Sequence, residues 1–328
     1  MSTLRPSIAA MSTPDSPIHP AHPHFEVVRE DLAFSSGSDR CDGWLYRPRT
    51  DATHPCVVMA HGIGGIRSAA LPEFATRFAA AGIAALTFDY RHSGTSGGVP
   101  RGLIDIRRQR ADLRAALDYA RGLDSVDPDR MALWGTSFGG GHVLATAAAN
   151  PRIGAAIIQN PFVDGRAAAA AAMRSAGRVA TYRLAVRALR DALRARRGRD
   201  PIYVDLVGEP GTVAMMTTPD ARAGFEAILP PDPIGWEPAV AARIALHLRS
   251  DRPATKADQV TCPLLVNVCD HDAITPPDPA IRVAEEAPRG ELSRYPIGHF
   301  DLFAGEWLNR VCADQIAFLR SNLIAVAQ

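Results

Sequence analysis

The sequence predicts a doubly wound α/β fold, built on a mostly parallel sheet, with an inserted helical cap. Three features lead to this prediction. Short apolar runs alternate with amphipathic helical stretches, the runs are continuously apolar, and the alternation stops over residues 164–257. Continuous apolar runs are typical of parallel strands that are buried on both faces between two layers of helices.

The first part of the chain is expected to alternate strands with a helix. Two antiparallel strands are expected over Phe25–Val28 and Gly43–Tyr46, because a loop rich in Gly, Ser and Asp joins two β-prone runs. A buried strand over Cys56–Ala60 follows. A helix is then expected over Pro72–Ala81, where apolar residues recur at helical spacing, and a second buried strand over Ile83–Phe88.

The same alternation continues along the chain. Further helices are expected over Ile104–Gly122, His142–Ala149 and Trp307–Leu323, and further strands over Met131–Trp134, Ala155–Ile158, Leu264–Val268 and Glu291–Tyr295. Residues 25–163 and 258–328 are therefore expected to form one α/β core. Residues 164–257 show no evident buried strand and are expected to form the cap. Residues 1–24, rich in Ser, Pro and His, are expected to be a disordered tail.

Composition argues against several classes of function. The 328 residues carry a formal net charge of +1, which provides no strong field for nucleic acid. No apolar run approaches the roughly 18 residues of a membrane span. Five cysteines, without CxxC spacing, favour a reducing cytoplasm. Prolines hold His19, His22 and His24 apart, which disfavours a metal site there. No metal or organic cofactor is expected.

The pentapeptide Gly135-Thr136-Ser137-Phe138-Gly139 carries the strongest functional signal. It has the G-x-S-x-G form, with an apolar strand before it and small residues after it. Such a tight strand-to-helix turn requires glycine and leaves the serine at a helix N-terminus. Ser137 is therefore predicted to be a nucleophile, with the N–H of Phe138 as an oxyanion donor. The alternative is a chance match in a Gly-rich turn.

A second glycine-rich turn, His61-Gly62-Ile63-Gly64-Gly65, follows the third expected strand. The N–H of Ile63 is predicted to be the second oxyanion donor, with a plain βα turn as the alternative. His61 is expected to brace this turn by hydrogen bonding. Asp89 and Arg91, in the polar loop after the next strand, are interpreted as residues that fix the loop.

A serine nucleophile needs a base and a group that orients the base. His299 lies after the last expected strand, in a loop that Gly298 makes adaptable, and is predicted to be the base. The alternative is a structural histidine that caps the final helix. Asp270 and Asp272 both follow the strand Leu264–Val268. Asp272 is preferred as the orienting carboxylate, because Asp270 lies closer to the strand and is suited to capping the loop.

Two features of the cap bear on the substrate. Met215, Met216 and Trp236 are tentative substrate contacts, with ordinary core packing as the alternative. A series of arginines is spaced so that many share one helical face, and a solvated surface is its simpler interpretation. The alternative is a dock for an acidic or phosphorylated acyl carrier. These arginines are Arg174, Arg178, Arg183, Arg187, Arg190, Arg194, Arg196, Arg197 and Arg199.

Together, these motifs resemble the α/β-hydrolase superfamily over about residues 25–328. One branch is particularly similar, that of the dienelactone-hydrolase-like and X-prolyl-dipeptidyl-peptidase-like hydrolases and the related polyketide transferases. The resemblance rests on the HGxGG turn at 61–65, the DYRxxGxSGG loop at 89–98, the GxSxG turn at 135–139, the DxxxP turn at 272–276 and GHFD at 298–301.

The resemblance implies Ser137, Asp272 and His299 as a catalytic triad, with Ile63 and Phe138 as oxyanion donors. Dienelactone hydrolases proper use a cysteine where this chain has Ser137, which argues against their kind of lactone specificity. The expected function is hydrolysis of an ester or thioester of a small-molecule acyl substrate through an acyl-enzyme, with a homodimer as the candidate assembly. An acyltransferase, a peptidase and a non-catalytic binding scaffold are the alternatives.

Overall fold

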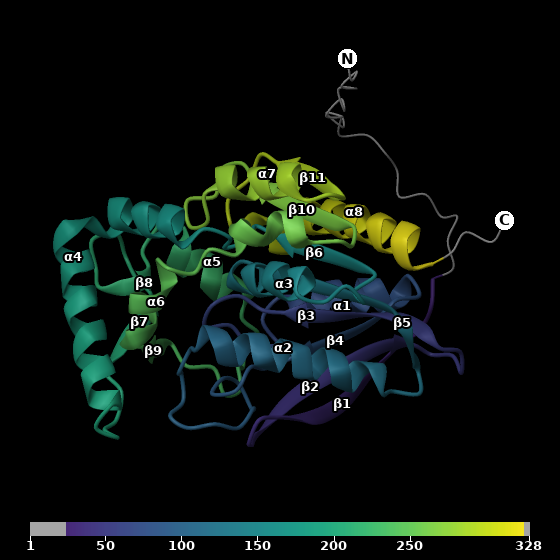
Figure 1. The fold of residues 1–328 in the computed structure, drawn as a ribbon, viewed down its shortest axis with the longest axis horizontal. Helices are drawn as coiled ribbons and strands as arrows, with labels where there is room; N and C mark the ends of the chain where they lie inside the picture. Colours follow the sequence, from purple (N-terminus) through teal and green to yellow (C-terminus); the bar gives the residue numbers. More distant parts are fainter. Residues whose placement is uncertain (1–23, 325–328) are drawn as a thin grey trace, which may run out of the picture.

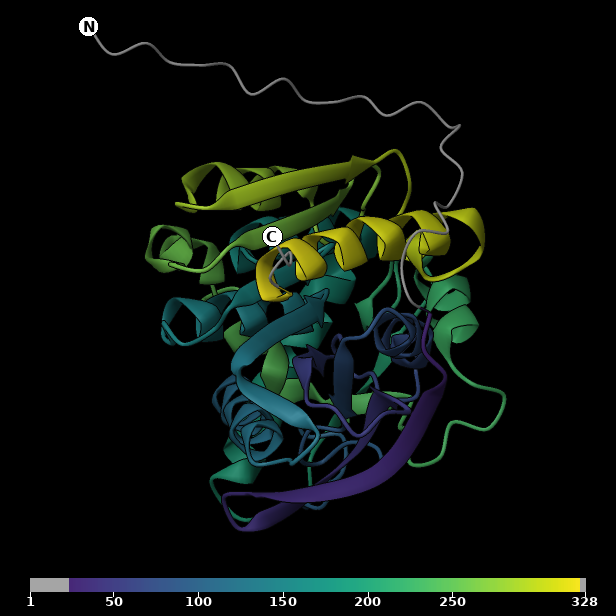
Figure 2. The ribbon, with the colours of Figure 1, turned by 90° about the vertical axis from the view of Figure 1, so that its right-hand side faces the viewer.

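The computed structural model describes residues 24–324 and contains one large and one small sheet (Figure 1). The large sheet has eight strands in the order β1-β2-β4-β3-β5-β6-β10-β11. These are β1 (Val27–Ser36), β2 (Asp39–Pro48), β3 (His54–Ala60), β4 (Ala84–Phe88), β5 (Val126–Thr136), β6 (Ala155–Gln159), β10 (Leu264–Cys269) and β11 (Gly290–Tyr295). The β1–β2 hairpin and β11 lie at opposite edges of the sheet (Figure 2).

Six strands of the large sheet run parallel. β3 pairs in parallel with β4 on one side and with β5 on the other, and β6, β10 and β11 continue in the same direction. Only β1 and β2 are antiparallel to their neighbours. The chain thus reverses its winding at β3, so that the carboxyl ends of β3 and β5 meet where doubly wound folds place their sites. The predicted fold class is confirmed.

Helices cover both faces of the large sheet. Successive side chains of β3 alternate between two apolar clusters, and all of them are buried. Two helices pack in one cluster and three in the other, as expected for a sheet between two helical layers. The first pair is α1 (Leu71–Ala80) and α8 (Gly305–Leu323), and the other three are α2 (Ile106–Arg121), α3 (Phe138–Ala148) and α7 (Pro277–Glu286).

Residues 164–257, called the insertion below, connect β6 to β10 and form one side of the molecule, with α4 outermost (Figure 1). The expectation that they lack strands is wrong, because three short strands form the small sheet in the order β8-β7-β9. These strands are too short for their periodicity to be recognised. The elements are α4 (Gly165–Ala195), β7 (Tyr203–Val207), β8 (Ala214–Met216), α5 (Ala221–Ile228), β9 (Ala239–Ala241), η1 (Ala242–Ile244) and α6 (Ala245–Leu248).

Some elements differ from the sequence-based expectation. α3 begins at Phe138, directly after Ser137, and not at His142. α7 was not expected. The remaining short helical turns are η2 (Pro253–Gln259) and η3 (Asp301–Phe303). The expected tail, residues 1–24, lies outside the described residues except for His24. Within 24–324, no helix has both the length and the apolar character needed to cross a bilayer.

Candidate active site

Ser137 occupies the sharp turn between β5 and α3. Its backbone lies at φ 52° and ψ −122°, a region that costs free energy for a residue with a side chain. Two backbone hydrogen bonds to the end of β6 and the loop after it hold Ser137 there. Its N–H donates to the carbonyl of Gln159 (2.9 Å), and its carbonyl accepts from the N–H of Phe162 (2.8 Å). The side chain is 8% exposed. The turn therefore fixes the hydroxyl at the N-terminus of α3.

The glycines on either side of Ser137 are required by close backbone contacts. A Cβ atom on Gly135 would lie 2.4 Å from the carbonyl oxygen of Gly139. A Cβ atom on Gly139 would lie 2.3 Å from the carbonyl oxygen of Ala60, at the end of β3. Helix α3 consequently packs directly against the end of β3, and Ser137 is brought beside the turn that begins at His61.

His299 and Asp272 form a buried pair at the ends of β11 and β10. The imidazole Nδ1 lies 2.6 Å from Oδ2 of Asp272, and the two residues are 3% and 6% exposed. The other carboxylate oxygen, Oδ1, accepts from the N–H groups of Ile274 and Thr275, both at 2.8 Å. The hydroxyl of Thr275 lies 2.7 Å from Oδ2. These contacts fix the orientation of the carboxylate, with Oδ2 directed at the imidazole.

Asp270, the competing carboxylate, points elsewhere. Its Oδ1 accepts from Nε of Arg294 at 2.8 Å, and that arginine is largely exposed. Asp270, directly after β10, is partly exposed, whereas Asp272 in the following turn is buried. The structure thus places the preferred carboxylate, and not the alternative, beside His299.

Ser137 and His299 share the lining of a small pocket of about 30 Å³, together with Gly62 and Ile63. Ser137 and Ile63 also line a larger cavity of about 210 Å³, which Phe138 borders as well. The predicted triad and the two predicted oxyanion donors therefore lie together at the carboxyl ends of the parallel strands. Ser137 stands where the two spaces meet.

The glycine-rich turn after β3 is held from both the core and the insertion. Nδ1 of His61 lies 2.9 Å from the carbonyl of Gly62, which confirms the expected bracing. Burial lowers the pKa of His61, which favours the neutral form of its imidazole. The ring packs edge-on against Tyr90. From the insertion, Nε1 of Trp236 donates to the carbonyl of Gly64 (3.0 Å). The backbone of Ile63 is thereby fixed beside Ser137.

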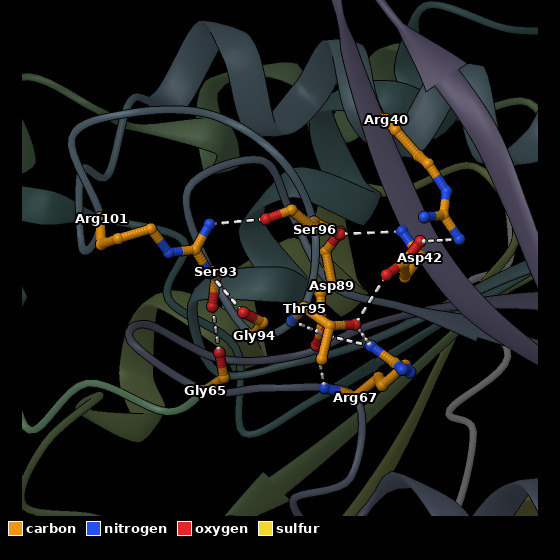
Figure 3. A network of polar contacts seen from close by, with 10 residues as sticks. All are labelled: Arg40, Asp42, Gly65, Arg67, Asp89, Ser93, Gly94, Thr95, Ser96 and Arg101. Carbon is orange, nitrogen blue, oxygen red and sulfur yellow. Dashed lines mark hydrogen bonds and ion pairs between the residues drawn. The ribbon is translucent and has the colours of Figure 1, made fainter. Parts of the chain in front are cut away.

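A polar network behind this turn anchors it further (Figure 3). Asp89, which is buried, accepts from the backbone N–H of Arg67 (2.6 Å) and pairs with its guanidinium. The hydroxyl of Ser93 donates to the carbonyl of Gly65 (3.0 Å). Arg91 makes a separate buried pair with Asp112 (2.6 Å). The interpretation of Asp89 and Arg91 as loop-fixing residues is confirmed.

Asn160, at the end of β6, is a site residue that the sequence reading missed. Its Oδ1 accepts from the hydroxyl of Thr136 (2.8 Å), next to Ser137, and its Nδ2 donates to the carbonyl of His299 (2.9 Å). Its backbone lies at φ 35°, which asparagine tolerates better than most residues. An Asn-Pro pair after an apolar strand was the only available signal, and it indicates no more than a turn.

The insertion residues divide into two groups. Met215 and Met216 line the larger cavity, as tentatively predicted. Trp236 is not in the described lining of either space. Its ring stacks on Phe225, and its Nε1 donates to the carbonyl of Gly64. Nowhere in residues 24–324 do three or more His, Cys, Asp or Glu side chains gather in a way suited to a metal ion.

Comparisons with known proteins place this geometry in a family. The family model described as serine aminopeptidase, S33, matches residues 51–304. The quorum-quenching protein AidA of Acinetobacter baumannii is 43% identical over 290 residues, which cover 88% of this chain and 94% of that protein. The acyltransferase drtE of Aspergillus calidoustus is 30% identical over 72% of this chain and 76% of its own length.

Among solved structures, the α/β hydrolase GrgF from Penicillium sp. sh18 superimposes with a TM-score of 0.76 at 24% identity, over 91% of this chain and all of that one. This likeness supports the fold. The family match covers most of the chain and includes Ser137, Asp272 and His299. The chain therefore belongs to the S33 serine aminopeptidase family of α/β hydrolases.

Proposed function

We propose that the protein is a serine hydrolase that cleaves a carboxylic ester or thioester through an acyl-enzyme. One observation carries the proposal. His299, buried and paired with Asp272 at 2.6 Å, lines the same pocket as Ser137, which is held at a strained strand-to-helix turn. A nucleophile, a base and a group that orients the base are the parts that acyl transfer to serine requires.

The proposed mechanism follows from these positions. His299 takes the proton from the Ser137 hydroxyl as the oxygen attacks the carbonyl carbon. Asp272 fixes the imidazole tautomer and stabilises its cation. The N–H groups of Phe138 and Ile63 bind the oxyanion, and His299 then gives its proton to the leaving group. Water, activated by His299, hydrolyses the acyl-enzyme and releases the acid and free Ser137.

The test is hydrolysis of p-nitrophenyl butyrate by the wild type and by Ser137→Ala. We expect kcat to fall by about 10⁶ in the variant, because the nucleophile of a working triad is removed. A phosphonate ester that labels the wild type but not Ser137→Ala would identify the same atom directly. Equal turnover by the two proteins would refute the mechanism.

Acyl transfer to an acceptor other than water is the second candidate. It is favoured by the relative named an acyltransferase, and it uses the same residues. The distinction lies in the product: when a medium-chain alcohol or amine is added, a transferase forms the new ester or amide in preference to the free acid. Chromatography of the products at equal substrate conversion separates the two.

Two further substrates are suggested by names alone. The bacterial relative is named quorum-quenching, and the family is described as serine aminopeptidase. An N-acyl homoserine lactone, which joins an acyl chain to a cyclic ester, is the probe for the first, and a dipeptide p-nitroanilide for the second. We expect the N-acyl homoserine lactone to be preferred over the dipeptide p-nitroanilide, because the described lining of the larger cavity beside Ser137 contains no carboxylate to bind a peptide's amino terminus.

A further inference from the structure

Ser137 stands between two spaces of unequal size, and the residues around each indicate which half of an ester it suits. His299 lines the smaller pocket, of about 30 Å³. Among the described residues, it does not line the larger cavity, of about 210 Å³. A general acid must reach the leaving group to protonate it. The leaving group therefore belongs on the side of the smaller pocket, and the acyl group on the side of the larger cavity.

The larger cavity is suited to hydrocarbon. Arg249 is the one charged residue of its described lining, and the polar remainder consists mainly of hydroxyl groups. Met173 and Leu246, which also line it, are 46% and 40% exposed, so the cavity opens to solvent beside them. Binding a hydrocarbon chain in such an apolar, partly open cavity is favourable, because the chain's apolar surface is removed from water.

The width of this cavity depends on the helix that forms one wall. The face of α4 that lines it presents alanines where larger side chains would fill the space, and Met215, Met216 and Phe162 lie among the other lining residues. Alanine and leucine have nearly equal helix propensities, so the helix itself does not require alanine at these positions. The alanines that α4 contributes to the lining are Ala168, Ala169, Ala172, Ala176, Ala180 and Ala185.

We propose that the larger cavity binds an unbranched acyl chain of medium length, with its carbonyl at Ser137 and its tail along the alanines of α4. A water-sized group needs roughly 10–30 Å³ of such space, so the cavity accommodates on the order of ten methylene-sized groups. This inference rests on the proposed function, because the positions of Ser137 and His299 set the direction of the ester.

The first test is the hydrolysis of p-nitrophenyl esters from acetate to dodecanoate. We expect kcat/KM of the wild type to rise about fourfold for each added methylene until the cavity is full. Ala168→Leu and Ala180→Leu reduce the volume of the cavity. The loss of kcat/KM in these variants is therefore expected to grow with chain length, and the optimum to move to a shorter acyl chain. Ala170→Leu is the matched control, because Ala170 lies on the same helix outside the described lining.

A wild type that is insensitive to chain length, or cavity variants that lose activity equally on all esters, would overturn the inference.

A second test does not depend on turnover. In Ser137→Ala, the fluorescent probe 1-anilinonaphthalene-8-sulfonate is displaced by alcohols from butanol to decanol. We expect the affinity of Ser137→Ala for the alcohol to rise about fourfold per carbon. In the double variant with Ala180→Leu, we expect the affinity for decanol to fall.

The two tests separate the inference from the function on which it rests. If the wild type hydrolyses no ester, the proposed function fails, and the displacement series alone decides what the cavity binds. If hydrolysis depends on Ser137 but neither kinetics nor displacement depends on chain length, the hydrolase stands and the acyl-chain assignment is wrong.

Discussion

The α/β core and the insertion surround Ser137 with different kinds of contacts. On the core side, buried polar groups hold one another: Asp272 meets His299, two backbone N–H groups and the hydroxyl of Thr275. On the insertion side, the wall is apolar. The insertion's contribution to the larger cavity is mostly alanine, methionine, leucine and threonine side chains, with Arg249 as the one charged residue of the described lining. A buried polar network in which every group is hydrogen-bonded fixes the positions of its members, because moving one leaves another unpaired. An apolar wall tolerates substitution better, because it has no such pairing to preserve.

This contrast assigns different tasks to the two regions. Changes at the core edge are expected to alter the chemistry, and changes in the insertion to alter which substrate fits. The regions are nevertheless joined at the site, since Trp236 of the insertion holds the carbonyl of Gly64. Within the insertion, buried Asp191 accepts from the N–H of Ile202 and pairs with Arg243 at 2.7 Å, which ties α4 to the small sheet.

The contrast is sharpest for the two neighbouring carboxylates. Asp272→Asn leaves a group of the same shape beside His299 but favours the wrong imidazole tautomer, so we expect kcat to fall by about 10⁴. Asp270→Asn removes only a partly exposed pair with Arg294, and we expect a change of less than about twofold. Steady-state kinetics on one ester compares the two. Similar losses in both variants would contradict the assignment of Asp272.

Asn160 provides a smaller effect on the core side. Asn160→Gly keeps the φ of 35° accessible but removes the hydrogen bonds to Thr136 and to the carbonyl of His299. Because His299 loses a positional restraint, we expect kcat to fall by about tenfold with KM nearly unchanged. Asn150→Gly, whose side chain accepts only from the N–H of Arg152 within the described chain, is the control. A lower melting temperature with unchanged kcat would show a purely structural role for Asn160.

How much was predictable from the sequence also differs between the regions. The turn at Ser137 and the loop of His299 carry local patterns, because close backbone contacts there require glycine at fixed positions. Asn160 acts only through residues that are distant in sequence, so no local pattern could identify it. Helix α7 has prolines at Pro277 and Pro279, which suggest a turn but are tolerated in the first turn of a helix.

The insertion was harder to read for a physical reason. β8 and β9 have three residues each, fewer than periodicity requires, and β7 has five, of which Tyr203 and Asp205 are exposed. The small sheet is also held by contacts that are not local, since buried Asp191 of α4 accepts from the N–H of Ile202, next to β7, and pairs with Arg243, after β9. Trp236 was expected to contact substrate, because a large aromatic residue in the cap suggests a pocket wall. Its actual partner, the carbonyl of Gly64 on the core, cannot be identified from the sequence.

The smallest expected effect concerns the arginines of α4. Arg187 is exposed, and Nε of Arg194 donates to the carbonyl of Asp200, yet neither pairs with a carboxylate in residues 24–324. If they form a solvated face, Arg187→Glu with Arg194→Glu changes kcat/KM on octanoyl-coenzyme A by less than about twofold at low or high salt, because neither residue is in the described lining of the two spaces beside Ser137. Octanoyl-N-acetylcysteamine, the same thioester without phosphates, is the control substrate. A loss of tenfold or more, confined to the coenzyme A thioester at low salt, would instead show that the insertion contributes charge as well as shape to substrate selection.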